Sequence, residues 1–167
     1  MAATTQISIE EYLKTVYRPD CDYVDGVIEE RNLGETDHAL VQTRFAYFFM
    51  GLYKQTGLLP ITELRMRVSE NKYRIPDLVV TRGKPSEQVL TTPPLLCIEV
   101  LSREDRVSRT NTRVQEYLDF GVPVVWVVDP AERIVWIYRR SGMEQASGES
   151  LKLDGTDIEV PFSEIFD

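Results

Sequence analysis

Ile75-Pro76-Asp77-Leu78-Val79-Val80 is an apolar stretch with a single carboxylate, and Leu95-Leu96-Cys97-Ile98-Glu99-Val100-Leu101 is a second one. Both stretches have the composition of buried β-strands. Because side chains alternate between the two faces of a strand, Asp77 and Glu99 each share a face with apolar neighbours. A buried carboxylate is costly unless a cation or a dedicated partner holds it. The two stretches therefore suggest neighbouring strands whose acids hold one metal ion.

Each acid also has a simpler interpretation. Asp77 directly follows a proline, so it could be a turn or strand-end residue. Glu99 could form a buried ion pair with Arg74 or with Arg113. The residues alone leave these alternatives open.

The overall composition is that of an ordinary globular domain. The chain has 167 residues, of which 43% are hydrophobic and 28% are charged. This length predicts a single domain over residues 1–167. Cys21 and Cys97, the two cysteines, are far apart in the sequence and indicate neither a disulfide framework nor a zinc site.

The charge balance gives no general reason to expect binding to nucleic acid. The net charge is −8 and the isoelectric point is about 4.8. A nucleic-acid-binding protein with this balance would need a local basic patch. Arginine nevertheless outnumbers lysine by fourteen to five, and its side chain is suited to forked contacts with phosphate.

The sequence gives no sign of a targeting or membrane segment. Residues 1–6 (MAATTQ) form neither a basic nor an apolar segment of the signal type. The longest apolar run, from Val122 to Val128, is too short to cross a bilayer. We therefore expect a cytoplasmic protein with no membrane partner.

Periodicity and turn signals predict the order of the helices and strands. A capping box at Ser8 opens a short helix to about Tyr17, and a long helix runs from Thr36 or Asp37 to Gly57. A loop and a further helix are expected within 102–120, which ends before Gly121. The side chains expected to point inward from the long helix are Val41, Phe45, Phe48 and Leu52. Strands are expected within 23–28 (two strands around a turn), at 61–68, 73–81, 95–101, 122–128 and 134–138, and near 151 and 158. This order predicts an α/β domain on a mixed sheet.

Several short motifs follow one another in a characteristic order. They are Tyr23-Val24-Asp25-Gly26, His38 at the start of the long helix, Arg74-Ile75-Pro76-Asp77, Ile98-Glu99-Val100-Leu101-Ser102, Tyr117 to Trp126, Val128-Asp129-Pro130 and the closing Ile165-Phe166. Together they resemble the PD-(D/E)XK nuclease superfamily, and within it a bacterial family of proposed restriction endonucleases. The resemblance covers roughly residues 9–166.

The resemblance implies a fold and a metal site. The implied fold is a restriction-endonuclease-like αβββαβ core on a mixed sheet, with extra N-terminal and C-terminal strands. The implied metal is Mg²⁺, with Mn²⁺ as a substitute, bound by Asp77, Glu99 and the backbone carbonyl of Val100. Oxygen donors of this kind suit hard cations. Such a metal would polarise the scissile phosphate and lower the pKa of the attacking water.

The sequence departs from the family pattern at the third position of the E-x-K triplet, which is Leu101 rather than lysine. In the family branch that this chain resembles, the lysine is usually found on the following helix, at the position of Arg113. Arginine keeps the positive charge but is never deprotonated at ordinary pH. Arg113 could therefore stabilise charge on the phosphate, whereas activity would be lost if this position had to act as a base.

Further arginines and a histidine are candidate site residues. Arg103, Arg106, Arg109 and Arg113 are spaced 3, 3 and 4 residues apart, which would align them on one side of a helix that begins early enough. Such a row could contact phosphate groups or could be a solvated surface balanced by nearby acids. His38, the only histidine, either lines the active site or has a structural role.

Two main functions from different classes follow. The first is a Mg²⁺-dependent endonuclease that hydrolyses DNA phosphodiester bonds, with Asp77, Glu99, Arg113 and His38 as catalytic residues. The second is a nuclease-fold protein that has lost catalysis and acts as a non-enzymatic binding or regulatory homo-oligomer. A metal-dependent hydrolase of another substrate is a weaker third alternative, because a fold does not fix a function. Nucleases of this fold commonly work as dimers, so the resemblance implies a homodimer, and residues 122–138 could supply an apolar contact surface.

Overall fold

The computed structural model describes residues 6–32, 34–103 and 107–166. The helices are α1 (Ile9–Lys14), α2 (Thr36–Thr56), α3 (Val107–Phe120) and α4 (Phe162–Phe166). The strands of the first half are β1 (Cys21–Val24), β2 (Val27–Glu30), β3 (Leu58–Thr62), β4 (Met66–Ser69), β5 (Lys72–Arg74) and β6 (Leu78–Arg82). The strands of the second half are β7 (Leu96–Val100), β8 (Val125–Asp129), β9 (Ile134–Arg139), β10 (Gly142–Gln145), β11 (Ser150–Lys152) and β12 (Glu159–Pro161).

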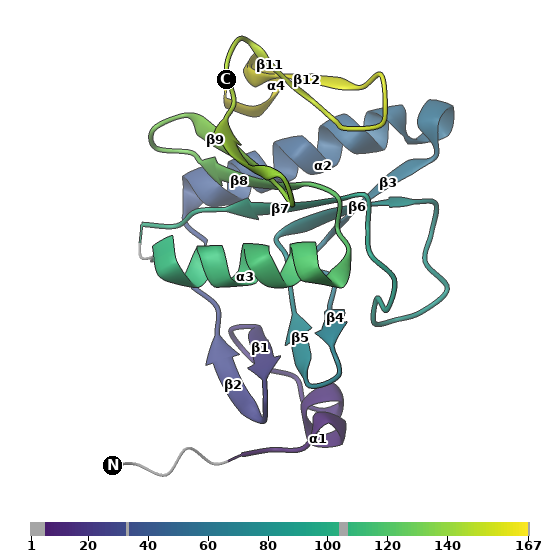
Figure 1. Cartoon of the computed structure of the whole chain (residues 1–167), viewed down its shortest axis with the longest axis vertical. Coiled ribbons are helices and arrows are strands. Elements are labelled where there is room, and N and C mark those ends of the chain that lie inside the picture. Colours follow the sequence, from purple (N-terminus) through teal and green to yellow (C-terminus); the bar gives the residue numbers. More distant parts are fainter. Residues whose placement is uncertain (1–5, 33, 104–106, 167) are drawn as a thin grey trace.

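A mixed six-stranded sheet lies between the two long helices, with α2 behind it and α3 in front of it in the view of Figure 1. Its strand order is β10-β9-β8-β7-β6-β3. β7 and β8 run parallel, and the other neighbouring strands in this sheet are antiparallel. A four-stranded sheet with the order β2-β1-β5-β4 extends from one side of this layer, and a small sheet of β11 and β12 lies with α4 at the opposite end (Figure 1). The predicted α/β architecture on a mixed sheet is thus confirmed.

The central sheet carries an apolar core on each face. Alternation along β7 directs Leu96 and Ile98 into the cluster that includes the buried side chains of α2. Cys97 points to the other face and belongs to the cluster that includes Tyr117 and Leu118 of α3. β7 is thus covered on both sides, which explains why it is apolar at almost every position.

The inward face of α2 differs from the sequence expectation. Val41, Phe45 and Phe49 are its buried side chains, whereas Phe48 and Leu52 are only half-buried. A repeat of four residues keeps these three side chains in one ridge, which packs against the sheet. The rings of Phe45 and Phe49 lie 6.1 and 6.5 Å from the ring of Trp126 on β8.

Two predicted strands are each divided in two by the structure. The stretch 61–68 bends at Glu63, whose φ of 52° is left-handed, so β3 belongs to the six-stranded sheet and β4 to the four-stranded one. The stretch 73–81 is interrupted at Pro76, which has no N–H to donate to a sheet. β5 and β6 therefore also belong to different sheets. Asp77 consequently lies at the junction of the two sheets, directly before β6, rather than in the middle of a strand.

Most other elements agree with the sequence. Ser8 caps α1, accepting a hydrogen bond from the Glu11 N–H at 3.1 Å, although the helix ends at Lys14 rather than near Tyr17. The Asp25-Gly26 turn joins β1 to β2, and Gly57 closes α2 in the left-handed conformation. The strand β10 was not expected.

Part of the stretch that could have supplied an apolar contact surface lies inside the protein, from Val124 to Val128, whereas Trp136 and Tyr138 of the following strand β9 are half-buried. Trp126 is fully buried, and so are Val124, directly before β8, and Val125, Val127 and Val128 on β8. The reason is that β8 occupies an inner position of the six-stranded sheet. Among the helices of the described part of the chain, none combines the length and the apolar character needed to cross a bilayer.

Candidate active site

Asp77 and Glu99 lie opposite each other at one end of the β6–β7 pair. The antiparallel register pairs Leu78 with Ile98. Asp77, directly before Leu78, therefore faces Glu99, directly after Ile98. Both acids are buried, with exposed fractions of 4% and 2%. The expectation that the two apolar stretches form neighbouring strands is therefore confirmed.

The two carboxylates face a common small cavity. Its volume is about 10 Å³, which is roughly the space that one water molecule or one ion occupies. The other residues that line it are Arg31, Asn32, His38, Val100, Ser102 and Arg113. Acidic and basic side chains from both sheets, from α2 and from α3 thus converge on one small space.

The Asp77 carboxylate accepts hydrogen bonds through both oxygens. Arg31 donates to Oδ1 through Nη2, and the backbone N–H of Val100 donates to Oδ2 at 2.7 Å. His38 Nε2 lies 3.3 Å from the same Oδ2. Burial alone would raise the pKa of Asp77, but the contacts with His38, Arg31 and the Val100 N–H outweigh it and lower the pKa below its ordinary value.

Glu99 has a different environment. The Tyr117 hydroxyl donates to Oε1 at 2.5 Å, and Arg113 Nη1 lies 3.8 Å from Oε2. Burial, and then the negative charge of Asp77, raise the pKa of Glu99 to about 7, against the opposing effect of Arg113. Without a further cation, the two acids therefore differ in protonation, with Asp77 ionised and Glu99 holding a proton over much of the acidic range.

The alternative ion pair of Glu99 with Arg113 is present, although its atoms are at the long end of the range. The alternative pair with Arg74 is not formed. Arg74 is buried in a separate cluster, where Nη1 donates to Asp22 at 3.0 Å and to Glu29 at 2.7 Å. Its Nε donates to Glu116 of α3 at 2.6 Å. Arg74 is therefore a partner of three other acids.

Arg103, Arg109 and Arg113, the described arginines of the expected row, do not lie on one line. Arg103 lies before α3, is 82% exposed and places Nε 3.4 Å from Glu35, and Arg106 lies outside the described residues. Arg109 is exposed on α3, whereas Arg113 is directed toward Glu99. Arg103 and Arg109 nevertheless line one hollow of about 670 Å³, together with Arg31 and Ser102. This hollow adjoins the small cavity because both are lined by Arg31, Asn32 and Ser102.

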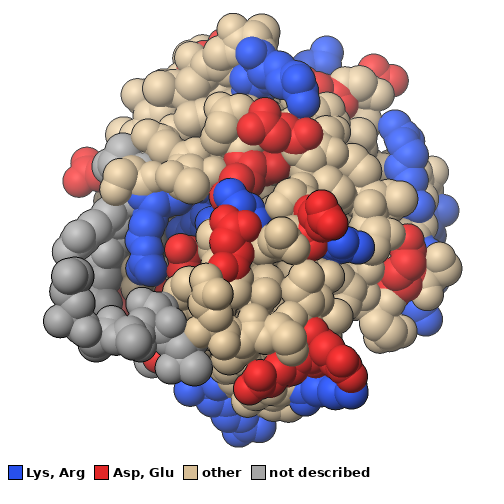
Figure 2. Space-filling model, turned by 60° about the horizontal axis from the view of Figure 1, so that its bottom comes forward, with Lys and Arg blue, Asp and Glu red and all other residues tan. Residues whose placement is uncertain are grey.

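The surface charges are mixed rather than grouped by sign. On the face shown in Figure 2, Lys and Arg side chains lie between Asp and Glu side chains. The acidic net charge is therefore not offset on this face by a broad basic patch within the described residues. The basic side chains that line the 670 Å³ hollow are local to it.

The donor set fits a hard divalent cation under one condition. Two carboxylates and the backbone of Val100 border a cavity of suitable size, and Mg²⁺ commonly takes one or two carboxylates and keeps several waters. No group of three or more His, Cys, Asp or Glu side chains suited to a metal occurs in the described ranges. Arg31 engages Asp77 Oδ1, so an ion that binds this oxygen has to replace the guanidinium group.

Sequence reasoning missed two contributors to this site. Arg31 follows β2 and lies 46 residues from Asp77 in the chain, and no periodic pattern links them. Tyr117 is fully buried, and its hydroxyl donates a hydrogen bond to Glu99. The one feature of the sequence that could have indicated this contact is a tyrosine on the helix that follows the strand of Glu99. Gln42, four residues after His38 on α2, donates to the Asp77 backbone carbonyl at 2.8 Å.

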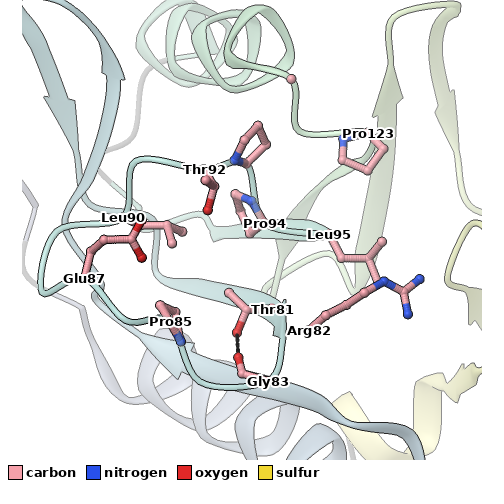
Figure 3. A pocket seen from close by; sticks show the side chains of 12 residues that line it. Thr81, Arg82, Gly83, Pro85, Glu87, Leu90, Thr92, Pro94, Leu95 and Pro123 are labelled. Atoms are coloured by element: carbon pink, nitrogen blue, oxygen red, sulfur yellow. Dashed lines mark hydrogen bonds between the residues drawn. The ribbon is translucent and has the colours of Figure 1, made fainter.

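A larger cavity lies at the other end of the same strands. It measures about 350 Å³ and is lined by prolines, by Leu90 and Leu95, and by Thr81 (Figure 3). The Thr81 hydroxyl donates to the carbonyl of Gly83 at 2.8 Å, so its polar hydrogen is used within the chain. The cavity brings no set of acids or histidines together among its lining residues, and it offers no chemistry comparable to that of the acid-lined cavity.

Comparisons with known proteins give a family and a fold. Residues 9–161 match the Uma2 family, whose description is "Putative restriction endonuclease". A crystal structure of a protein from Anabaena variabilis, described as a putative nuclease belonging to DUF820, is similar to this chain with a TM-score of 0.81. The two share 20% sequence identity over 96% of this chain and 97% of the other, so the likeness concerns the fold. No curated protein matches the chain.

Proposed function

Because the chain belongs to the Uma2 family of "Putative restriction endonuclease" proteins, we propose that it is a divalent-metal-dependent endonuclease that hydrolyses phosphodiester bonds of DNA. In this proposal Mg²⁺ is the ion, with Mn²⁺ as a substitute. The order α2, β3, β6, β7, α3, β8 around the central sheet supports a restriction-endonuclease-like αβββαβ core. The four-stranded sheet and the C-terminal strands are additions to it.

One observation carries the proposal: two buried carboxylates from paired strands face one ion-sized cavity. Burial of two acids at such short range is unfavourable unless positive charge compensates it. The adjoining hollow of about 670 Å³, with its three arginines, gives a nucleic-acid backbone access to this cavity. Arginine is the side chain best suited to hold phosphate there.

The proposed roles follow from the contacts of each side chain. Asp77 and Glu99, with the Val100 carbonyl, would hold the ion, which when bound polarises the phosphate and lowers the pKa of the attacking water. Arg113 is positioned beside Glu99 to stabilise negative charge on the phosphate. His38 lies against Asp77 and orients this carboxylate. The exposed Arg103 and Arg109 would position the backbone of the nucleic acid, and Arg106 shares this proposed role from outside the described residues.

Arg31 has a double role in this proposal. It neutralises Asp77 while no ion is present, and it lines both the small cavity and the hollow. If Asp77 held an ion in place of the guanidinium group, Arg31 would be able to turn toward a phosphate in the hollow. The positive charge would then remain close to the reacting group.

A second candidate function is a non-enzymatic binding or regulatory protein. The observation that favours it is that arginines already accompany both acids, Arg31 on Asp77 and Arg113 on Glu99. When both acids are ionised, the local charge of these four groups balances without a metal ion. In this alternative the arginines replace the ion permanently.

Nicking of a supercoiled plasmid in Mg²⁺ or Mn²⁺ tests the proposal. We expect the wild-type chain to nick DNA, and Asp77→Asn to lower the rate by at least about 100-fold because a carboxylate ligand is removed. Asp157→Asn is the matched control, because Asp157 is exposed and lines none of the cavities described above. Binding of Mn²⁺ measured by titration calorimetry should be lost in Asp77→Asn and retained in the control.

The same assay separates the two candidate functions. Absence of nicking by every variant, together with absence of Mn²⁺ binding, would reject the enzymatic proposal. Nicking that is gained only in Arg113→Lys would identify a chain that has lost catalysis through this substitution. DNA binding without cleavage in all variants would favour the non-enzymatic alternative.

A further inference from the structure

The outward face of α2 is unusually apolar for a surface helix. Leu40, Tyr47 and Met50 lie on it with exposed fractions of 47%, 77% and 50%. They are three of the six large hydrophobic side chains that are exposed in the described part of the chain. The opposite face of the helix packs against the central sheet through Phe45 and Phe49, so these outward side chains contribute nothing to that core.

The same face is also nearly free of charge. Three of the 21 residues of α2 are charged, about half the 28% found in the whole chain. Of these, Arg44 is engaged within the molecule, because its Nη1 donates to the backbone carbonyl of Ile165 at 3.1 Å. Two copies of a chain with a net charge of −8 repel each other over most of their surfaces. Between Leu40 and Met50 the helix has no charged residue except Arg44, so this repulsion is smallest on the middle of the face.

The spacing of the outward row suits a second copy of the same helix. The row consists of Thr36, Leu40, Thr43, Tyr47, Met50 and Lys54. Its intervals of 4, 3, 4, 3 and 4 residues are those of a heptad seam, which allows side chains of two helices to interdigitate. The intervals read the same in both directions. Two antiparallel helices related by a twofold axis would therefore pair Leu40 with the partner's Met50, and Thr43 with the partner's Tyr47.

The charges at the two ends of the row are complementary in that arrangement. Lys54 would lie opposite the partner's Thr36, next to the acidic Asp37 and Glu35 at the beginning of the partner's helix. Twofold symmetry would form this contact twice, once at each end of the seam. Opposite charges at the rim of an interface fix its register and favour correct encounters.

We infer that the outward face of α2 binds a second copy of this chain in an antiparallel, twofold-symmetric helix pair. The stretch from Leu40 to Met50 is about 15 Å long at the usual helical rise. One such helix pair is smaller than the roughly 800 Å² per partner of a standard interface. The homodimer is therefore weak and depends on protein concentration. This inference is independent of the proposed hydrolysis, because none of the outward residues lines the acid cavity.

Sedimentation equilibrium of the full chain, from micromolar to near-millimolar concentration, tests this inference. We expect a monomer–dimer equilibrium for the wild type. Tyr47→Glu should raise the dissociation constant at least about tenfold, because it places a charge at the most exposed position of the seam. Met143→Glu is the matched control, because Met143 is also exposed, at 55%, but lies on β10, and the dissociation constant should not change.

A charge exchange tests the antiparallel register. Lys54→Glu should weaken the dimer, and adding Asp37→Lys should restore part of the lost affinity. Both residues are exposed, so these variants remain informative if circular dichroism shows that Tyr47→Glu has not folded. A monomer at every concentration would overturn the inference, as would equal dissociation constants for wild type, Tyr47→Glu and Lys54→Glu. Such results would leave this face to another partner or to none.

Discussion

At one end of the β6–β7 pair, Asp77 and Glu99 face a cavity of about 10 Å³. At the other end, Thr81 and Leu95 line a cavity of about 350 Å³ (Figure 3). The smaller cavity is bordered by buried charges that come from four different parts of the chain. The larger one is bordered mainly by prolines, aliphatic groups and a threonine hydroxyl that is already bonded. Of these two cavities, the smaller one is the candidate reactive site, because burying charge is costly and groups of buried charges mark functional sites.

This contrast has an energetic consequence that can be measured by unfolding. Charges buried at the acid end, and in the Arg74 cluster that lines a hollow together with Arg31 and Arg113, are stable only as complete sets. The proline-lined end has no such dependence, because its polar groups are exposed or bonded to nearby backbone. Substitutions at the two ends should therefore differ in size even when the chemical change is the same.

Arg74→Met should produce the largest effect. Arg74 is 3% exposed and donates to three carboxylates at 2.6 to 3.0 Å. Its loss leaves Asp22 buried without its main cation and should lower the free energy of unfolding by about 3–5 kcal/mol. Arg82→Met is the same change in an exposed residue at the proline-lined end and should cost less than about 0.5 kcal/mol. Urea unfolding of both variants at pH 7 measures the difference, and equal effects would contradict the contrast.

The pH dependence of Glu99 should produce the next effect. Its pKa is raised from 4.5 to about 7 in the folded chain. Because the raised pKa favours the protonated folded state, the stabilisation is complete below pH 4.5 and is lost as the pH rises through 7. The full loss is on the order of 3 kcal/mol.

Glu99→Gln isolates this contribution, because glutamine stays neutral in both folded and unfolded states. Asp77, Arg31, Arg113 and Tyr117 surround position 99 in both proteins, so their own titrations largely cancel. The free energy of unfolding of the wild type, minus that of Glu99→Gln, should fall between pH 5 and pH 8 in the presence of a chelator. A difference that does not change with pH would show that Glu99 is ionised throughout.

Some features of the acid-lined end could be predicted from the sequence and others could not. The pairing of the two acid-bearing stretches was predictable, because a lone carboxylate in an apolar run is rare and each run has the length of one strand. The division of 73–81 at Pro76 was not anticipated, although the missing N–H of proline indicates it. The partner of Asp77 could not be predicted, since Arg31 directly follows β2 of the four-stranded sheet and only the three-dimensional fold brings it to the acid.

The inward face of α2 shows a second limit of sequence interpretation. Phe48 and Phe49 are adjacent, equally apolar side chains, and periodicity alone accepts either within its tolerance. The position of the central sheet relative to α2 decides which of the two is covered, and Phe49 is the one that is buried. The outward position of Tyr47 follows from the same rotation of the helix, so the proposed self-association surface could not be identified without the structure.

Tyr117→Phe should have a moderate effect. It removes the hydroxyl that donates to Glu99 at 2.5 Å, and hydrogen bonds to charged groups contribute about 1.5–3 kcal/mol. Tyr12→Phe is the matched control, because Tyr12 is also fully buried but donates to a neutral carbonyl, that of Cys21, at 2.8 Å. This control should cost about 0.5–1.5 kcal/mol. Thermal unfolding at pH 8 should separate the two variants, and a larger loss in Tyr12→Phe would argue against an ionised Glu99 at that pH.

Thr81→Val should have the smallest effect, and it tests the proline-lined end directly. The substitution keeps the shape of the side chain and removes the donor to the Gly83 carbonyl. Gly83 is half-buried, so water can replace the hydroxyl and the cost should be about 1 kcal/mol or less. Thr81 lies four residues from Asp77, but its side chain lines the other cavity, so plasmid nicking should be unchanged. A loss of nicking comparable to that of Asp77→Asn, with little change in stability, would place a functional group at the larger cavity and reverse the assignment of the two ends.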